Sequence, residues 1–309
     1  MLLRTIRRLL IAALPACWSA APAAPCPPAA PQPSLAQLQA AKAQDRGLLW
    51  RLQRDGRTSY LYGTLHVGRA EWVSPGPRVA AALAGSAVLA LEIDPGDAGV
   101  QRDLAAADPT AAPLPAALQA RLARQITAAC LPEAAFSAMH PAMQAAVLAM
   151  LEARWVGLDP GYAQEQALAR GARADGRRVV SLESVALQKK VLVPDEAAGL
   201  ALIEQALEQL ESGQGRSVMT RLARAWEHGD LATLEDYPRW CDCVRNDEER
   251  AAMRALNDDR NPALAERIEA LHREGKPVFA AVGALHMTGP AGLPRLLAAR
   301  GFRVERVVW

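Results

Sequence analysis

Aromatic residues and net charge are both scarce in this chain. Aromatic side chains account for 5% of its 309 residues, and the formal net charge is only +2. No basic run is interleaved with aromatic residues, so we expect no nucleic-acid partner. No apolar run is long enough to cross a bilayer as a helix, so we expect no transmembrane span. The chain also lacks His-Glu-x-x-His, Gly-x-Ser-x-Gly and phosphate-loop motifs, which removes three common types of catalytic site.

The overall composition is typical of a globular protein, and the N-terminal segment is typical of an export signal. Hydrophobic residues make up 51% and charged residues 22%, and a chain of this length can bury a substantial core. Arginines, a short apolar run and the small residues Ala21-Pro22-Ala23 predict a signal peptide over 1–23. A Pro/Ala-rich segment over 24–46 is typical of a disordered linker, and we expect the ordered domain over 47–309. These features predict an exported protein whose compartment is the periplasm.

Two features of the cysteines bear on export. Leu14-Pro15-Ala16-Cys17 resembles a lipoprotein cleavage box, so a lipid anchor at Cys17 and an outer-membrane location are the less favoured alternative. Removal of the signal would leave four cysteines: Cys26, Cys130, Cys241 and Cys243. In an exported protein an even number predicts a structural disulfide. Cys241 and Cys243 are too close in sequence for an easy bridge between them, so either could instead reach Cys130 or Cys26, and the pairing is left unassigned.

Strand and helix patterns alternate along the chain. A hairpin signal at Asp55-Gly56 separates the first two expected strands. The strands are expected over 49–52, 59–62, 88–93, 178–183, 278–282 and 303–308. Helical patterns cover 115–129, 141–154, 162–174, 195–210, 218–227, 247–256, 262–273 and 293–300. The order predicts an α/β (α+β) fold in which helices flank a mixed central β-sheet, with a mostly helical insertion over 97–176.

A short motif occurs twice, each time directly after an apolar strand. Both copies read Gly-x-Leu-His, and they place His66 and His286 three residues after a glycine. Glycine allows a sharp turn and a close backbone approach, and open α/β sheets place their sites at the carboxyl ends of strands. We expect the two histidines to converge on one site. The structural alternative is that each one only caps its strand.

Two carboxylates also lie at or near the ends of expected strands. Glu92 lies among apolar residues, where an ionised carboxylate must be paired or bound to metal. Two imidazoles and a carboxylate make a catalytic metal set with open positions, and a salt bridge to an arginine is the alternative for Glu92. Glu183 is a candidate for a hydrogen-bond partner of the metal ligands, for a general base, or for a helix cap. Arg260 could hold a carboxylate or a developing oxyanion, and Asn261-Pro262 is typical of a helix N-cap followed by proline.

These segments together resemble the TraB/GumN (Tiki-like) family. The matching residues include 61–68, 91–93, Leu182-Glu183 with Gln188, 259–261 and 282–289. The resemblance implies a metal-dependent peptidase acting on a peptide or protein substrate. His66 and His286 would bind Mn, Co or Zn, Glu92 would act as ligand or general base, and Arg260, Asn261 and Glu183 would complete the site. The chain departs from the pattern at 161–163, where relatives often carry an acidic residue. A related group implies the alternative, a haem- or metal-binding module without catalysis.

Overall fold

The computed structural model describes residues 26–28, 30, 43–106, 113–132, 134, 136 and 139–309. The expected signal peptide, Cys17 and most of the expected linker lie outside these residues. Among the helices of the described part, none is both long and apolar enough to cross a membrane.

The sheet has six strands in the order β4-β3-β5-β2-β1-β6. Their bounds are β1 Leu48–Arg54, β2 Arg57–Thr64, β3 Val88–Leu91, β4 Arg178–Ser181, β5 Val278–Gly283 and β6 Arg303–Val307. β1 pairs antiparallel with both β2 and β6, whereas β2, β5, β3 and β4 run parallel to one another. The mixed α/β sheet expected from the sequence is therefore confirmed.

The hairpin between β1 and β2 turns where the sequence indicates. Asp55 and Gly56 both have positive φ, at 51° and 70°, as a two-residue hairpin turn requires. Arg54 pairs with Arg57 across this turn, and the register continues to Leu48 opposite Gly63. The hairpin thus determines where β2 ends, and with it the position of the first histidine motif.

The four parallel strands end at one edge of the sheet. Thr64 of β2 pairs with Gly283 of β5, and Leu91 of β3 pairs with both Ala281 of β5 and Ser181 of β4. The residues that follow these strands are therefore brought to a common edge, which is where open α/β sheets bind ligands. His66, Glu92, Glu183 and His286 all come within three residues of a strand end.

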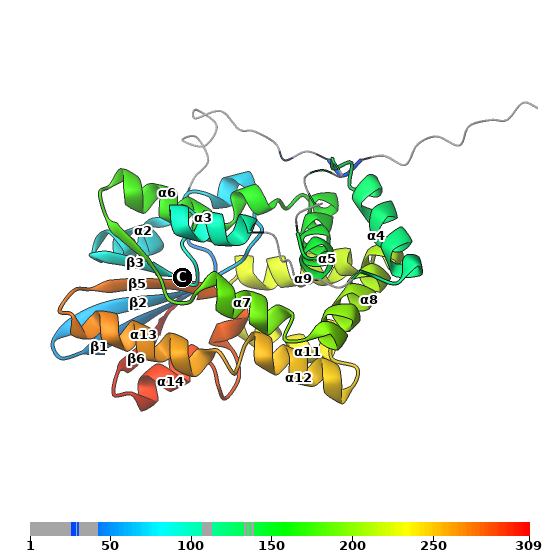
Figure 1. Cartoon of the computed structure of the whole chain (residues 1–309). Helices are drawn as coiled ribbons and strands as arrows, with labels where there is room; N and C mark the ends of the chain where they lie inside the picture. The colour runs from blue at the N-terminus through cyan, green and yellow to red at the C-terminus, as the bar shows by residue number, and fades with distance from the viewer. Residues whose placement is uncertain are drawn as a thin grey trace, which may run out of the picture.

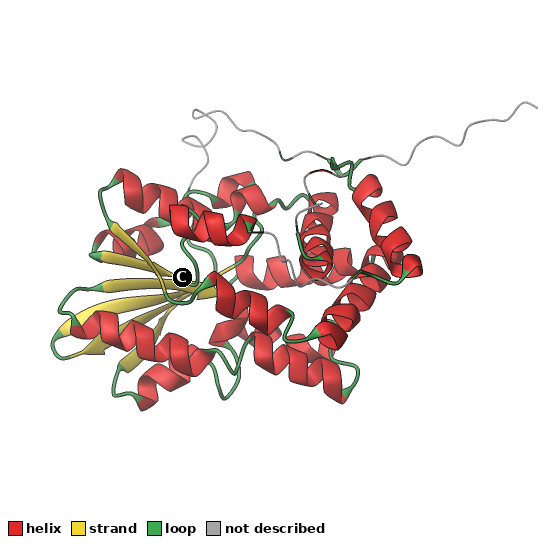
Figure 2. Ribbon diagram, in the orientation of Figure 1, coloured by secondary structure: helices red, strands yellow, loops and turns green. Residues whose placement is uncertain are grey.

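Helices cover both faces of the sheet. Figures 1 and 2 show α2, α3 and α6 on one side and α13 and α14 on the other. The helices that connect or cover the strands are α2 Pro77–Ala84, α3 Ala98–Ala105, α6 Gln164–Ala174, α7 Val185–Leu192, α12 Asp247–Leu256, α13 Asn261–Arg273 and α14 Leu293–Ala299. Short 3₁₀ turns are η1 Ala70–Trp72, η3 Glu152–Val156, η4 Pro160–Tyr162 and η5 Ala284–Met287.

A second group of helices packs beyond the sheet. It contains α4 Ala116–Ala128, α5 Pro141–Leu151, α8 Glu196–Ser212, α9 Gln214–Glu227, α10 Leu231–Glu235 and α11 Tyr237–Trp240. Its apolar core is built from α4, α5 and α8 and includes Leu122, Leu148, Ile203 and Leu207. A larger core lies around the sheet. In Figure 1 the group of α4, α5 and α8 and the β1–β2 turn lie at opposite ends of the sheet, so the helices face the carboxyl ends of the parallel strands.

The cysteines pair differently from the expectation. Cys26 is bonded to Cys130, and Cys241 is bonded to Cys243 with a Cα–Cα distance of 5.1 Å. The expectation that Cys241 and Cys243 are too close to pair is wrong, because Asp242 between them adopts φ 53°. Aspartate tolerates this left-handed conformation, which turns the chain so that both sulfurs meet. The presence of disulfides is compatible with an exported protein.

Candidate functional site

His286 is buried and its ring orientation is determined by one partner. The ring lies in η5 directly after β5 and is 4% exposed. Its Nδ1 lies 2.6 Å from Asn261 Oδ1, while Asn261 Nδ2 donates to the Ala291 carbonyl at 2.9 Å. Because the amide oxygen faces the ring, Nδ1 carries the hydrogen and Nε2 keeps its lone pair. Burial lowers the pKa of His286, so the neutral ring that can bind a cation is favoured.

Asn261 therefore has a different role from the one its local sequence indicates. It is the first residue of α13, and no side chain caps that helix. The amide instead connects His286 to the loop at Ala291. The expectation of an N-cap is wrong, since a buried imidazole offers this amide a stronger competing partner than its own helix.

His66 has the same sequence context but a different environment. Its side chain is 60% exposed, and its Nδ1 lies 3.1 Å from Glu165 Oε1. The charge of Glu165 is the main reason that the pKa of His66 is raised to about 9. The two motif histidines therefore share an edge of the sheet but differ in exposure, since His286 is buried in the core whereas His66 is exposed beside the Glu165 carboxylate.

Glycines in both motifs permit close contacts that a Cβ would tighten at Gly63 and Gly283 and would prevent at Gly68. A Cβ on Gly63 would lie 3.2 Å from Ala284 Cα, so the two motifs are packed against each other. A Cβ on Gly68 would lie 2.3 Å from the Tyr162 carbonyl oxygen, and one on Gly283 would lie 3.2 Å from Glu92 Oε1. The first motif is thus packed against the segment before α6, and the second against the candidate carboxylate.

Glu92 lies between a histidine and an arginine. Its Oε1 accepts a hydrogen bond from Gly283 N at 2.7 Å and lies 3.9 Å from His286 Nε2. Its Oε2 accepts from Arg260 Nη2 at 2.7 Å. Burial alone would raise the pKa of Glu92, but His286, His66, Arg260 and the Gly283 amide outweigh it and lower the pKa to about 2. Glu92 therefore has the arginine partner of the alternative interpretation and also faces His286.

Arg260 joins two carboxylates. It donates from Nε to Glu183 Oε1 at 2.9 Å, and its Nη2 contacts both Glu183 and Glu92. Gln188 of α7 donates to Glu183 at 3.2 Å and to Glu92 at 3.3 Å. The neighbouring carboxylates outweigh burial and raise the pKa of Arg260. The structure therefore brings together Glu92, Glu183 and Arg260, as expected, and adds α7, a helix that the sequence pattern did not indicate.

Glu165 is a buried member of the site that the sequence analysis missed. Its Oε1 accepts from Thr64 Oγ1 at 2.5 Å and contacts His66, whereas its buried Oε2 has no hydrogen-bond partner in the described part of the chain. Gln164 holds α6 against the first motif by accepting from Leu65 N at 2.9 Å. An acidic residue in the first turn of the expected helix 162–174 was the available signal.

The histidine and carboxylate side chains of the site are candidate ligands of a divalent cation. Within the described residues, no three His, Cys, Asp or Glu side chains are arranged to hold a metal ion as they stand. Glu92 contacts Arg260, and His66 contacts Glu165. The chemistry of the set nevertheless fits, because His286 Nε2 is free of a hydrogen, Glu165 Oε2 is buried without a partner among the described residues, and two carboxylates, Glu92 and Glu183, share the guanidinium of Arg260. A divalent ion would balance this excess of negative charge.

Comparison with known proteins gives one family. A family model described as the TraB/PrgY/gumN family matches residues 48–306. No curated protein and no solved structure matches the chain. The match covers the sheet, both histidine motifs and all the helices between them.

Proposed function

The chain belongs to the TraB/PrgY/gumN family, and on that premise we propose that it is an exported, periplasmic metal-dependent peptidase. The observation that carries the proposal is the His286–Asn261 pair, which leaves Nε2 free and facing Glu92 at the carboxyl edge of the sheet. Histidines that bind metals characteristically donate their second ring N–H to such a partner.

His66, His286 and Glu92 would hold the ion, which is Mn, Co or Zn. Glu165 Oε2 offers one further oxygen, since it is buried without a donor. When bound, such an ion acts as a Lewis acid and lowers the pKa of a coordinated water. His66 is exposed and held by one carboxylate, so its ring is able to turn toward a cation without disturbing the core.

The remaining side chains hold and orient this set. Glu183 and Gln188 fix Arg260 against Glu92. Three donors bind the oxygens of Glu92, namely Gly283 N, Arg260 and Gln188. An acceptor held in this way is suited to bind a cation rather than to carry a proton. Arg260 keeps its charge beside the reacting centre, where it would stabilise negative charge developing on a peptide carbonyl oxygen.

Isothermal titration with Mn²⁺, Co²⁺ and Zn²⁺ tests the proposal. We expect the protein to bind at least one ion, and the His66→Ala, His286→Ala double variant to lose that binding together with hydrolysis of a quenched fluorescent peptide library. His228→Ala is the matched control, because His228 lies at the end of α9, away from the strand ends, and its ring contacts the Arg224 carbonyl. Undiminished metal affinity in the double variant would refute the site. Hemin binding with a Soret band, and no hydrolysis with any metal, would favour the non-catalytic binding module.

A further inference from the structure

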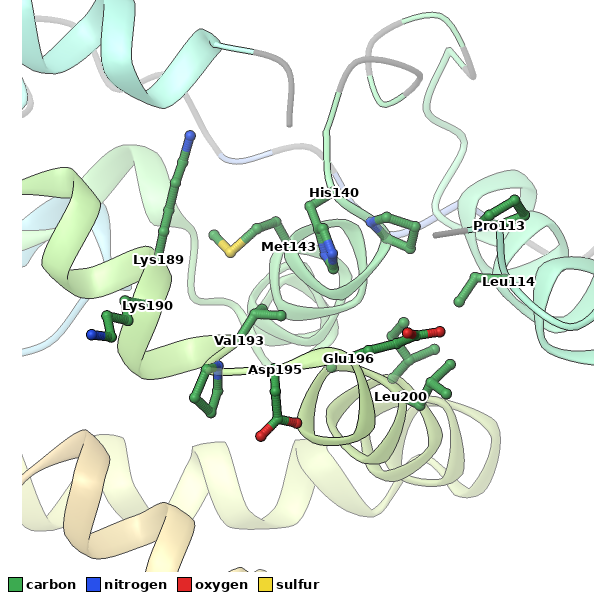
Figure 3. A pocket seen from close by; sticks show the side chains of 14 residues that line it. Pro113, Leu114, His140, Met143, Lys189, Lys190, Val193, Asp195, Glu196 and Leu200 are labelled. Atoms are coloured by element: carbon green, nitrogen blue, oxygen red, sulfur yellow. The ribbon is translucent and has the colours of Figure 1, made fainter. Parts of the chain in front are cut away.

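A cavity lies where α5, α7 and α8 meet. Its volume is about 370 Å³, within the range of small-molecule and side-chain subsites. Met143 of α5, Val193 after α7 and Leu200 and Ile203 of α8 form its apolar walls. Figure 3 shows Met143 above Val193, with His140 beside Met143. The cavity thus has the lining that accepts an apolar side chain.

The helix α7 connects this cavity to the site. Gln188 contacts Glu92 and Glu183, and the next two residues, Lys189 and Lys190, line the cavity. The four residue steps from Gln188 to Leu192, the last residue of α7 before Val193, rise about 6 Å. An extended peptide covers this length with roughly two residues. A substrate held at Glu92 would therefore reach the cavity with a side chain two or three residues from the bond that is cleaved.

The charged side chains around the cavity differ in whether they already have a hydrogen-bond partner. Lys189 Nζ already donates to the Asp103 carbonyl at 2.7 Å. Asp195 is engaged as the N-cap of α8 through Ala198 N at 2.9 Å, and Glu196 lies beside Leu200 (Figure 3). Lys190 is exposed, and no hydrogen bond or ion pair engages it within the described residues. On the α7 side of the cavity the charge without a partner among the described residues is therefore that of Lys190, which favours an acidic group, whereas Glu196 contributes a negative charge on the α8 side.

We propose that this cavity is a substrate subsite that binds an apolar side chain, and that Lys190 pairs with an acidic residue next to it. The inference rests on the proposed peptidase function, because it names the peptides that the site would select. The subsite adds a determinant of substrate specificity that lies outside the two histidine motifs, with Lys190 on α7.

Fluorescence anisotropy with three labelled hexapeptides in EDTA tests the subsite without hydrolysis. The peptides are Gly-Gly-Leu-Asp-Gly-Gly, Gly-Gly-Leu-Lys-Gly-Gly and Gly-Gly-Ser-Asp-Gly-Gly. We expect the Leu-Asp peptide to bind about 10-fold more tightly than the Ser-Asp peptide, since the leucine is buried. Its advantage over the Leu-Lys peptide should be about 2- to 5-fold, the range of an exposed ion pair.

Variants identify the residues responsible. Lys190→Glu should reverse the preference between the Leu-Asp and Leu-Lys peptides, whereas Lys276→Glu, an exposed lysine before the amino end of β5, should leave it unchanged. Met143→Trp should fill the cavity and weaken Leu-Asp binding about 10-fold, whereas Met139→Trp, at a more exposed methionine that does not line it, should not. Because Lys190 is exposed, Lys190→Glu should fold normally. It therefore still tests the proposal if Met143→Trp fails to fold.

Two results would overturn the subsite: equal affinity for all three peptides, or equal effects of the test and control variants. Either one leaves the metal site intact, because peptide hydrolysis with Mn²⁺, Co²⁺ or Zn²⁺ is measured separately. Conversely, selective binding in EDTA without hydrolysis under any metal would support the subsite and contradict the peptidase.

Discussion

Single hydrogen bonds decide which atoms of the site are available. Asn261 occupies His286 Nδ1 and leaves Nε2 free, while Glu165 occupies His66 Nδ1. Arg260 takes up one oxygen of Glu92 and leaves the other facing His286. Asn261 and Arg260 thus present His286 and Glu92 without being ligand candidates themselves, so variants of these two partners separate positioning from ligation.

Asn261→Ala removes the acceptor of the His286 ring. We expect Mn²⁺ affinity to fall about 10- to 100-fold, as for other partners of metal-binding histidines. Stability should fall by about 1–3 kcal/mol, because buried polar groups lose their partners. Titration calorimetry and urea unfolding measure the two effects. Asn261→Asp keeps an oxygen opposite Nδ1 and should retain more metal affinity than Asn261→Ala; equal losses would argue against positioning.

Arg260→Leu leaves two buried carboxylates without their cation. The side chains of Arg260, Glu92 and Glu183 are 11%, 9% and 2% exposed, so we expect a loss of about 3–5 kcal/mol in the free energy of unfolding. Adding Glu183→Gln should restore part of that loss, since one uncompensated charge is removed. Urea unfolding of the single and double variants measures the coupling. Strictly additive effects would contradict a shared buried network.

At the scale of elements, the site depends on how α6 and α13 dock against strand ends. α6 is held to the first motif by Gln164, and α13 is held to the second by Asn261. The Gly68 N–H donates to the Asp159 carbonyl at 3.0 Å, and the Asp159 N–H donates back to the Gly68 carbonyl at 2.8 Å. Changes at these junctions should alter the site without touching its side chains.

Gly68→Ala should separate α6 from the first motif. The new Cβ would meet the Tyr162 carbonyl oxygen, a backbone atom that cannot move aside alone, so we expect a loss of about 1–3 kcal/mol and weaker Mn²⁺ binding. Gly171→Ala is the matched control, because its Cβ would meet nothing within 4 Å in the exposed part of α6. That substitution should stabilise the protein by about 0.5–1 kcal/mol. Thermal unfolding distinguishes them, and a tolerated Gly68→Ala would show that this contact is not required.

Asp230 provides a pH-dependent helix cap. It accepts from Thr233 N at 3.0 Å and from Thr233 Oγ1 at 2.6 Å, and the bond from the Thr233 side chain is the main cause of its lowered pKa. A lowered folded-state pKa adds stability above the unfolded value of about 3.9, which is lost as the pH falls through the folded value. Asp230→Ala should cost about 0.5–1 kcal/mol at pH 7.

Urea unfolding from pH 7 to pH 2.5 tests this linkage. The difference between the protein and Asp230→Ala should shrink toward the acid end. Asp230→Asn keeps an uncharged acceptor, so its difference from Asp230→Ala should vary little with pH. A constant cost of Asp230→Ala across the range would contradict the assignment.

At the scale of the whole molecule, two cores meet at the carboxyl edge of the sheet. One core surrounds the strands, and the other joins α4, α5 and α8. The metal candidates belong to the first core and the substrate cavity to the second, with α7 between them. Catalysis and peptide selection would thus depend on different parts of the fold. Substitutions in one part should therefore alter one property and preserve the other.

The two disulfides should contribute unequally to stability. Cys26 and Cys130 are 104 residues apart, whereas Cys241 and Cys243 are two apart. Because chain-entropy stabilisation grows with loop length, Cys26→Ser with Cys130→Ser should cost about 2–5 kcal/mol. Cys241→Ser with Cys243→Ser should cost about 1–2 kcal/mol on the same relation. Urea unfolding compares them, and a larger loss for the short loop would contradict the entropic account.

Local patterns in the sequence were sufficient for the strands, most of the helices and the edge at which the site lies. Asp55-Gly56 makes a turn by its own conformational preference, and a strand followed by Gly-x-Leu-His places His66 and His286 at strand ends whatever surrounds them. The mixed sheet and the family were therefore predictable, while metal binding and peptidase activity stay predictions. Only the tertiary structure decided the partners: Glu165 for His66, Asn261 for His286, and Cys243 for Cys241. Most such pairs join residues far apart in the chain, and each depends on packing and backbone geometry that a pattern of neighbouring residues does not contain.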